Sequence, residues 1–356
     1  KVLHGDRVLV RLTGTDYRGK PEATIVEVLE RRTNKLVGRF LNERGLFLVV
    51  PEDQRIKHDI LVPPGETAEA QHGQVVTVEI IEQPTRHTQP LGRVVEILGE
   101  IDDPGMEIEI AVRKFDVPHE FSPKALAQAE RLPSEVRDSD LVERFDLRDV
   151  PLITIDGEDA RDFDDAVYCE RVELGTGARK RAGWRLIVAI ADVSHYVRPG
   201  TALDEEAKLR ATSVYFPGYV VPMLPETLSN GICSLNPKVD RLCFACDMRI
   251  DRDGEVVEAE FYEAVMHSHA RLTYTQVWKA VGERDREARE SLGGLLPHVE
   301  RLHQLYRVLA KARARRGAIE FESAEVRFVL DNRGEVVQAG MLQRNDAHRL
   351  IEECMI

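Results

Sequence analysis

Alternating apolar and polar residues in the first hundred positions predict short β-strands rather than helices. The pattern is also repeated, because His4-Gly5-Asp-Arg-Val-Leu-Val returns 68 residues later as His72-Gly73-Gln-Val-Val-Thr-Val. Three further strands are predicted between the two copies, at Leu36–Phe40, Gly45–Val50 and Asp59–Pro63. A repeat of about 70 residues made of short strands is typical of five-stranded OB-type barrels.

The pattern divides the chain into four parts. Residues 33–102 contain a complete barrel, whereas residues 1–32 contain only the last two strands of a first one, so we expect the chain to begin inside a domain. Residues 103–146 are acidic and rich in turns, and predict a connector with one short helix that starts at Ser122-Pro123. Residues 147–356 mix strands and helices, which predicts an α+β domain.

Several elements of this last part have clear boundaries. Trp184–Ala191 is apolar and predicts a buried strand, while Asp253-Gly254 favours a hairpin turn. Asn345 is a predicted N-cap, and the helix that it begins stops without Gly or Pro, so we expect the C-terminus to interrupt a domain as well. The other predicted elements are a helix at Leu203–Thr212, strands at Arg241–Ile250 and Glu255–His267, one long helix over residues 286–316, and a hairpin around Asn332-Arg-Gly334.

Composition and charge exclude some classes of protein. The 356 residues are 43% hydrophobic and 31% charged, as in an ordinary soluble protein. No apolar run approaches the ~20 residues that a transmembrane helix needs, so we expect no membrane partner. The net charge of −13 argues against a polyanion as partner when taken as a whole. It is unevenly distributed, however, and the first hundred residues are nearly neutral, so charge alone does not decide for or against nucleic acid.

The five cysteines do not form an obvious site. Cys243 and Cys246 have the spacing of a zinc or redox pair, but both lie in a predicted strand. Residues three apart on a strand point to opposite faces, so these two thiols cannot easily share a metal. We therefore expect buried, free thiols and a reducing, cytoplasmic location.

The strongest candidate chemistry lies between Asp156 and Asp165, in the sequence DGEDARDFDD. Six of these ten residues are acidic, and only Arg161 offsets them. Carboxylates ~4 Å apart repel by ~1 kcal/mol in water and ~4 kcal/mol when partly buried, so such groups must splay into solvent, take up protons or surround a cation. Apolar runs end at Ile155 and begin at Ala166, which argues against a solvated tail. The stretch therefore predicts a Mg²⁺ site made of carboxylate oxygens.

Three alternatives to catalysis were weighed for this stretch. An EF-hand needs Gly at the sixth loop position, where Arg161 stands if the loop starts at Asp156, and no other register fits. A solvated acidic loop and a purely structural metal site both stay open. Catalysis is favoured because Mg²⁺ held by carboxylates is a standard way to polarise a phosphodiester and to activate a water.

Several motifs that follow in order along the chain resemble the ribonuclease II/ribonuclease R family. They are Ile155-Asp156-x5-Asp162-x-Asp164-Asp165, Val188-Ala-Ile-Ala-Asp192-Val-Ser194, Tyr215-Phe-Pro-Gly218, Pro222-Met-Leu-Pro225 with Leu228-Ser229, Arg316-Gly317 with Phe321-Glu322, and Leu350-Ile-Glu-Glu-Cys-Met355. The resemblance covers essentially the whole chain. It implies that the repeat is a pair of cold-shock OB domains, the first largely missing, and that residues 147–356 are the N-terminal part of an RNB catalytic domain.

The resemblance implies a processive, hydrolytic 3′→5′ exoribonuclease that uses Mg²⁺ and releases nucleoside 5′-monophosphates. Its partners would be single-stranded RNA and RNA with 3′ overhangs, including structured RNA. By motif position, Asp156, Asp162, Asp164 and Asp165 would hold the metal, with Asp164 and Asp165 as the catalytic pair. Tyr215 would stack on the last nucleotides of the RNA, a contact that ignores base sequence.

Other polar residues near these motifs are expected to have supporting roles. Glu158 and Asp159 fall between the motif positions and are interpreted as local charge. Asp192 and His195 follow a buried strand, where capping or orienting another group is favoured over metal binding.

The family pattern is also incomplete in this chain. The second half of the catalytic domain and a trailing S1 domain are missing from it, so we expect a monomeric enzyme as the intact parent and little or no activity from these 356 residues. An alternative of another class is a non-catalytic RNA-binding OB module with an incomplete active site. A metal-dependent DNA nuclease is a weaker third hypothesis.

Overall fold

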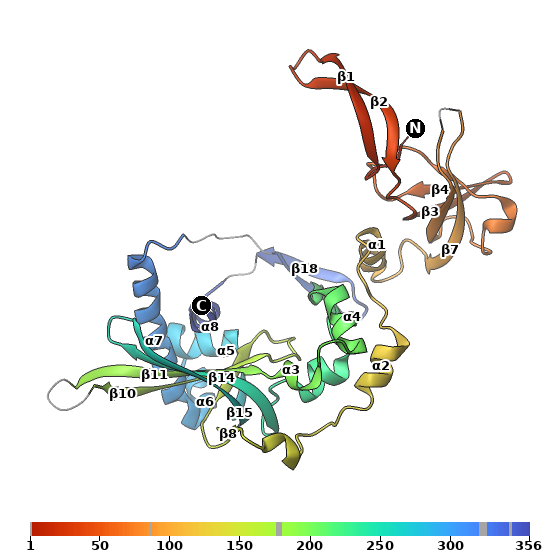
Figure 1. The fold of residues 1–356 in the computed structure, drawn as a ribbon. Helices are drawn as coiled ribbons and strands as arrows, with labels where there is room; N and C mark the ends of the chain where they lie inside the picture. The colour runs from red at the N-terminus through yellow and green to blue at the C-terminus, as the bar shows by residue number, and fades with distance from the viewer. Residues whose placement is uncertain (1, 86, 176–179, 320–325, 342–343) are drawn as a thin grey trace. The chain divides into compact units, whose positions relative to one another are not determined.

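The structure is a computed structural model that describes residues 2–85, 87–175, 180–319, 326–341 and 344–356. The chain forms two compact units, seen in Figure 1. The first comprises residues 1–119 together with 216–218 and 328–338, and the second comprises residues 120–215, 219–327 and 339–356. Each unit has a hydrophobic core of its own. The predicted mixed architecture, an OB-type barrel followed by an α+β domain, is confirmed.

The first unit contains a closed barrel with the strand order β3-β4-β5-β7-β6. Inward-facing residues such as Phe40, Val49 and Ile60 are buried in its core, as the alternating pattern predicts. The strand predicted at Asp59–Pro63 forms over two residues alone, Ile60 and Leu61. The barrel strands are β3 (Lys35–Glu43), β4 (Leu46–Pro51), β5 (Ile60–Leu61), β6 (Val75–Glu82) and β7 (Leu91–Gly99).

Two other elements belong to this unit. The strands β1 (Arg7–Thr15) and β2 (Pro21–Glu30) pair with each other in a two-stranded sheet, and most of their side chains are exposed. A helix that the sequence did not predict, α1 (Met106–Lys114), lies in the segment expected to be a connector. It begins after Gly105, whose φ is 84°, and no side chain caps it, so the usual N-terminal signal is missing. Met106 packs against barrel residues.

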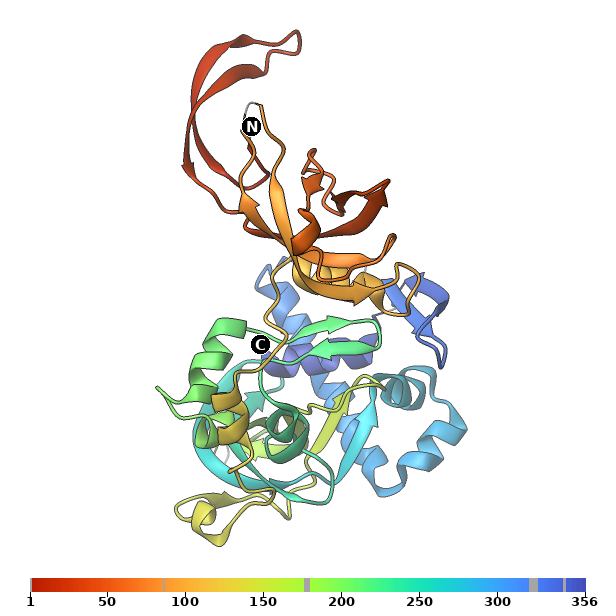
Figure 2. The same ribbon diagram turned by 90° about the vertical axis from the view of Figure 1, so that its right-hand side faces the viewer.

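The second unit, most of which runs from yellow-green to blue in Figure 2, is built on a seven-stranded sheet. The strand order is β16-β9-β10-β11-β14-β15-β8. Neighbours from β9 to β15 are antiparallel, whereas the edge strands β16 and β8 are parallel to β9 and β15. The strands of this sheet are β8 (Phe145–Asp146), β9 (Ile153–Asp156), β10 (Asp165–Leu174), β11 (Arg181–Ala191), β14 (Asp240–Asp251), β15 (Val256–His267) and β16 (Ala270–Thr273). Two hairpins are separate from it. They are β12 (Val214–Phe216) with β13 (Tyr219–Val221), and β17 (Val326–Leu330) with β18 (Val336–Met341).

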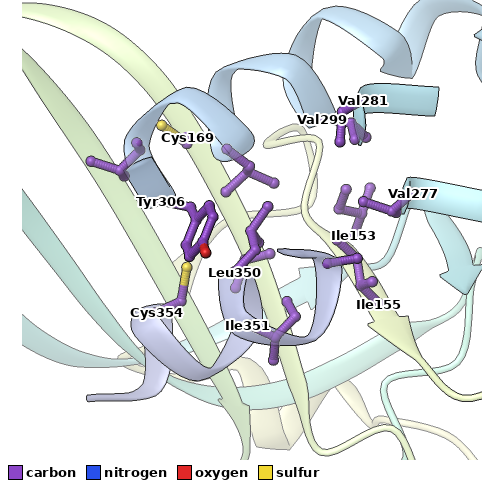
Figure 3. Close-up of a cluster of buried hydrophobic side chains, with 14 of the residues drawn as sticks. Ile153, Ile155, Cys169, Val277, Val281, Val299, Tyr306, Leu350, Ile351 and Cys354 are labelled. Carbon is purple, nitrogen blue, oxygen red and sulfur yellow. The ribbon is translucent and has the colours of Figure 1, made fainter. Parts of the chain in front are cut away.

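Helices cover one face of this sheet. Figure 3 shows Tyr306 of a long helix and Leu350 and Cys354 of the last helix packed together with Cys169 and Ile153 of the strands. The helices of this layer are α5 (Tyr274–Trp278), α6 (Arg286–Leu292), α7 (Leu296–Arg315) and α8 (Asp346–Met355). A second cluster joins the sheet to α2 (Pro123–Ala129), α3 (Val193–Tyr196) and α4 (Ala202–Arg210).

The capping signals were read correctly, but one predicted helix is divided in two. Ser122 and Asn345 accept hydrogen bonds from the backbone N–H groups of Ala125 and Ala347, as predicted for N-caps. The helical stretch predicted over residues 286–316 is confirmed, but it is divided into α6 and α7, because the chain turns at Gly293 (φ 51°). Two consecutive glycines have too little helix propensity to continue the helix.

Some further expectations concern single residue types. All five cysteines are free, and Cys243 and Cys246 lie on β14 with different surroundings, the first buried and the second half-buried. None of the described helices is long and apolar enough to cross a membrane. Phe321 and Glu322, part of the motif that follows Gly317, lie outside the described residues.

Candidate active site

The aspartate-rich stretch links two neighbouring strands of the sheet. Asp156 is the last residue of β9 and Asp165 the first of β10, and the two strands are hydrogen-bonded neighbours. The loop therefore starts and finishes at the same end of the sheet. Phe163, between the second and third motif aspartates, is buried in the core on one face of the sheet. Its burial ties the middle of the loop to the fold.

Backbone contacts fix the loop on either side of Phe163. The hydroxyl of Ser234 accepts from the N–H of Phe163 at 3.0 Å and donates to the carbonyl of Arg161 at 2.9 Å. The N–H of Ala191 donates to the carbonyl of Asp164 at 2.8 Å. These bonds hold the backbone from Arg161 to Asp164 in one conformation, which sets the directions of the aspartate side chains.

All four motif aspartates influence one another electrostatically. Burial raises the pKa of Asp165 to about 6, with further contributions from the charges of Asp156 and Asp164. Burial also raises the pKa of Asp156, and the Asp162 carboxylate adds to it. Asp164 keeps an exposed surface, yet enough protein surrounds it that burial, followed by Asp162 and Asp156, raises its pKa. The structure thus brings the four residues to one place.

These carboxylates have few partners in the described part of the chain. Asp156 Oδ1 accepts from the N–H of Gly157 at 2.7 Å, and Asp162 Oδ2 accepts from the hydroxyl of Tyr215 at 2.6 Å. The Oδ2 atom of Asp165 is buried and has no hydrogen-bond partner there. None of the four forms an ion pair with a described Lys, Arg or His. Apart from the charge of Arg271, which opposes the effect of burial on the pKa of Asp156, the negative charge of the cluster is not compensated by these residues.

The four carboxylates act on one another through their charges but do not form a ready-made metal cage. Among the described residues, no three His, Cys, Asp or Glu side chains lie close enough together to hold a metal ion as they stand.

Tyr215 lies beside this cluster. It belongs to β12, and its side chain is 64% exposed although its hydroxyl is hydrogen-bonded to Asp162. Burial of the hydroxyl and its bond to Asp162 raise the pKa of Tyr215 to about 12, so the group stays a donor at neutral pH. An exposed aromatic ring with a fixed hydroxyl suits stacking on a base.

Sequence reasoning missed a second tyrosine near the aspartates. Burial, with the charges of Asp156 and Asp165, raises the pKa of Tyr274, and its ring stacks on that of His348 with centroids 4.2 Å apart. Tyr274 comes directly after β16, whose Thr273 is in register with Asp156. Its place follows from the pairing of β16 with β9, which no local sequence signal predicts.

The neighbouring polar residues behave as expected from their positions. Glu158 accepts a short hydrogen bond from the Thr275 hydroxyl and lies 3.8 Å from the guanidinium of Arg327, so its charge is engaged within the loop surroundings. Asp192 caps α3 by accepting from the N–H of His195 at 3.2 Å, which confirms the capping role. It also accepts from Arg144 at 2.5 Å.

Comparison with known proteins agrees with this arrangement. A family model described as RNB domain matches residues 144–356, one described as Cold shock domain matches residues 48–122, and one described as Ribonuclease B OB domain matches residues 1–28. Ribonuclease R of Vibrio cholerae is 54% identical over 355 residues. The chain belongs to the RNB-domain family of ribonuclease R. Ribonuclease R of Escherichia coli is 51% identical over 354 residues, and the chain spans 42% and 43% of the lengths of these two relatives.

Solved structures show the same relationship. RNase R of Mycoplasma genitalium in complex with ribose methylated single-stranded RNA superposes with a TM-score of 0.87 at 27% identity, covering 99% of this chain and 55% of that one. Yeast Ssd1, described as a pseudonuclease, gives a TM-score of 0.60 at 17% identity over 87% of this chain and 38% of that one, which shows the fold alone. A shared fold therefore does not establish activity, which depends on the residues of the site.

Proposed function

We propose that this chain carries the metal-binding half of the active site of a processive 3′→5′ exoribonuclease, which hydrolyses RNA, structured RNA included, to nucleoside 5′-monophosphates. The observation that carries the proposal is the cluster of four aspartates without a cationic partner in the described chain. Membership of the ribonuclease R family supports it, as do the Mycoplasma genitalium complexes with single-stranded and with double-stranded RNA. We also propose the domain division 1–32, 33–102, 103–146 and 147–356.

The donor set of the cluster fits Mg²⁺. Asp156, Asp162, Asp164 and Asp165 would hold the ion, and the buried Oδ2 atom of Asp165, which has no partner, is the kind of oxygen that a hard cation satisfies. When bound, Mg²⁺ supplies polarisation of the phosphodiester and a nucleophilic water at neutral pH.

The protein's own groups have distinct parts in this proposal. Asp164 is the most exposed of the four aspartates, so it is the carboxylate best placed to reach the scissile phosphate, with Asp165 behind it. Tyr215 holds Asp162 through its hydroxyl and offers its exposed ring to the last nucleotides. The stacking is worth ~1–3 kcal/mol per base and does not depend on sequence, which suits a processive enzyme.

The experiment that tests this function is incubation of the intact protein and of the 356-residue chain with 5′-labelled single-stranded RNA and Mg²⁺. The intact protein is expected to convert the RNA to a short end product without intermediates, and the chain to show little or no cleavage. Retardation of the RNA by the intact protein without any cleavage would contradict the proposal.

A non-catalytic RNA-binding module is the second candidate function, favoured by the closed barrel of the first unit. The same assay separates the two, because a binding module retards labelled RNA whether or not Mg²⁺ is present. Labelled single-stranded DNA is the control for substrate class, and the exoribonuclease is expected to leave it intact.

A further inference from the structure

Arg271 contacts the aspartate loop at several points. Its Nη2 atom donates to the carbonyl of Glu158 at 2.5 Å and to those of Gly157 and Ala160 at 3.3 Å each. Its guanidinium also lies over the ring of Phe163, 5.1 Å from the centroid. Arg271 therefore touches the loop both before and after Asp162.

The backbone of Arg271 is fixed independently of these contacts. It lies in β16, which is parallel to β9, and Arg271 is in register with Thr154 two residues before Asp156. One arginine thus connects the strand that ends at the first motif aspartate with the loop that presents the second. Three carbonyls converge on the Nη2 atom while the planar guanidinium lies over the ring of Phe163. A lysine ammonium can donate to carbonyls, but it has no planar group to lie over the ring.

The charge of Arg271 acts to lower the pKa of Asp156 against the effect of burial, but the hydrogen bonds of the guanidinium go elsewhere. Among the described residues, Arg271 forms no ion pair with any motif aspartate, and its donors are directed at backbone carbonyls. A positive charge near a cation site weakens metal binding by repulsion. A residue that is electrostatically unfavourable for the metal, and yet holds the loop at three carbonyls, has a geometric role.

We propose that Arg271 is a positioning residue for the metal site, which fixes the loop 157–160 so that the carboxylates of Asp156 and Asp162 are held at the separation that a divalent cation requires. This inference rests on the proposed function, since it presumes that the four aspartates bind a metal. Residues that orient metal ligands without touching the metal typically change its affinity ~10- to 100-fold when they are removed.

The test measures Mn²⁺ binding to the 356-residue chain from the electron paramagnetic resonance signal of the free ion. Arg271→Met keeps the aliphatic stem and removes the donors, and Arg271→Lys keeps the charge but removes the planar group that lies over Phe163. Both are expected to bind Mn²⁺ ~10- to 100-fold more weakly than the wild type. Arg286→Met is the matched control, because Arg286 is an exposed partner of Glu290 on α6, and it is expected to bind as the wild type does.

The two explanations of Arg271 predict opposite signs. If the arginine acts only through its charge, Arg271→Met binds Mn²⁺ more tightly and Arg271→Lys binds it unchanged, and either result would overturn the proposal. Should Arg271→Met fail to fold by circular dichroism, the decision rests on Arg271→Lys. Failure of the wild-type chain to bind Mn²⁺ would overturn the proposed metal site itself, and this inference with it.

Discussion

Two groups of carboxylates on the same sheet are in opposite electrostatic situations. Asp247 on β14 is buried, but it accepts hydrogen bonds from Arg185 at 2.6–3.1 Å and from Arg249 at 2.6 Å. Burial raises its pKa, and these two arginines outweigh burial and bring it below the usual value. Asp165 on β10 has no such partner, and its pKa rises to about 6.

Asp192, like Asp247, is a buried carboxylate with an arginine partner. It is buried together with Arg144, and the hydrogen bonds from Arg144 and Ser194 outweigh burial, so that its pKa is lowered. The fold therefore supplies arginines to carboxylates that serve structure. It supplies none to Asp164 and Asp165, although leaving carboxylates uncompensated destabilises the folded state. The difference supports the proposal that these aspartates bind a cation from outside the chain.

The largest expected effect on stability comes from breaking the ion pair between Arg144 and Asp192. Arg144→Met leaves Asp192 buried without its ion-pair partner, and we expect a loss of ~3–5 kcal/mol in the free energy of unfolding, measured by urea denaturation. Asp164→Asn is the matched variant of the uncompensated group and is expected to unfold at the same urea concentration as the wild type or a higher one. Equal losses in the two variants would remove the distinction between the groups.

Activity is expected to depend on the motif aspartates and not on the carboxylates that are paired with arginine. Asp164→Asn in the intact protein should lower mononucleotide release ~10²–10³-fold or more, because the site loses a carboxylate that would hold Mg²⁺ at the reacting phosphate. RNA binding, measured by retardation without Mg²⁺, should persist. Asp247→Asn, corrected for the folded fraction, should retain its rate per molecule. If Asp164→Asn loses RNA binding as strongly as it loses cleavage, its role is not purely catalytic.

The comparison also shows where sequence reasoning succeeds. The spacing of the motif aspartates and the apolar runs on either side of them sufficed to predict a cluster between two core segments. Asn345 and Ser122 were predicted as caps because capping is local, needing one side chain and a backbone N–H two or three residues away.

What the sequence did not predict depends on contacts between distant residues. Tyr274 and Arg271 reach the aspartates only because β16 pairs in parallel with β9, more than a hundred residues earlier. Arg185 of β11 likewise contacts Asp247 of β14 because the two strands are paired. The helix α1 was not predicted for another reason. It begins after a glycine with positive φ, and no side chain caps it.

The pH dependence of stability should sharpen the comparison further. The pKa of Asp165 is about 6 in the folded chain against an ordinary value of 3.8, so folding disfavours its charged form. Below about pH 4, Asp165 carries its proton in the folded and in the unfolded chain, so it does not affect the free energy of unfolding. Above pH 6 it is ionised in both states, and the free energy of unfolding is lower by up to ~3 kcal/mol. Without metal, Asp165→Asn should therefore unfold like the wild type near pH 4 and be more stable than it at pH 7. Urea denaturation at both pH values measures this difference, and Mg²⁺ at pH 7 should narrow it. A difference that does not vary with pH would contradict the assignment.

The smallest effect concerns the one motif aspartate that accepts a hydrogen bond from another side chain. Tyr215→Phe removes the hydroxyl that donates to Asp162. The lost hydrogen bond is worth ~1 kcal/mol, so we expect Mn²⁺ to bind a few-fold more weakly. The ring is kept, so RNA affinity should not change. Tyr215→Ala removes the ring as well and should weaken RNA binding by ~1–3 kcal/mol in filter binding. If Phe and Ala weaken RNA binding equally, the hydroxyl and not the ring makes the contact, and the stacking role is wrong.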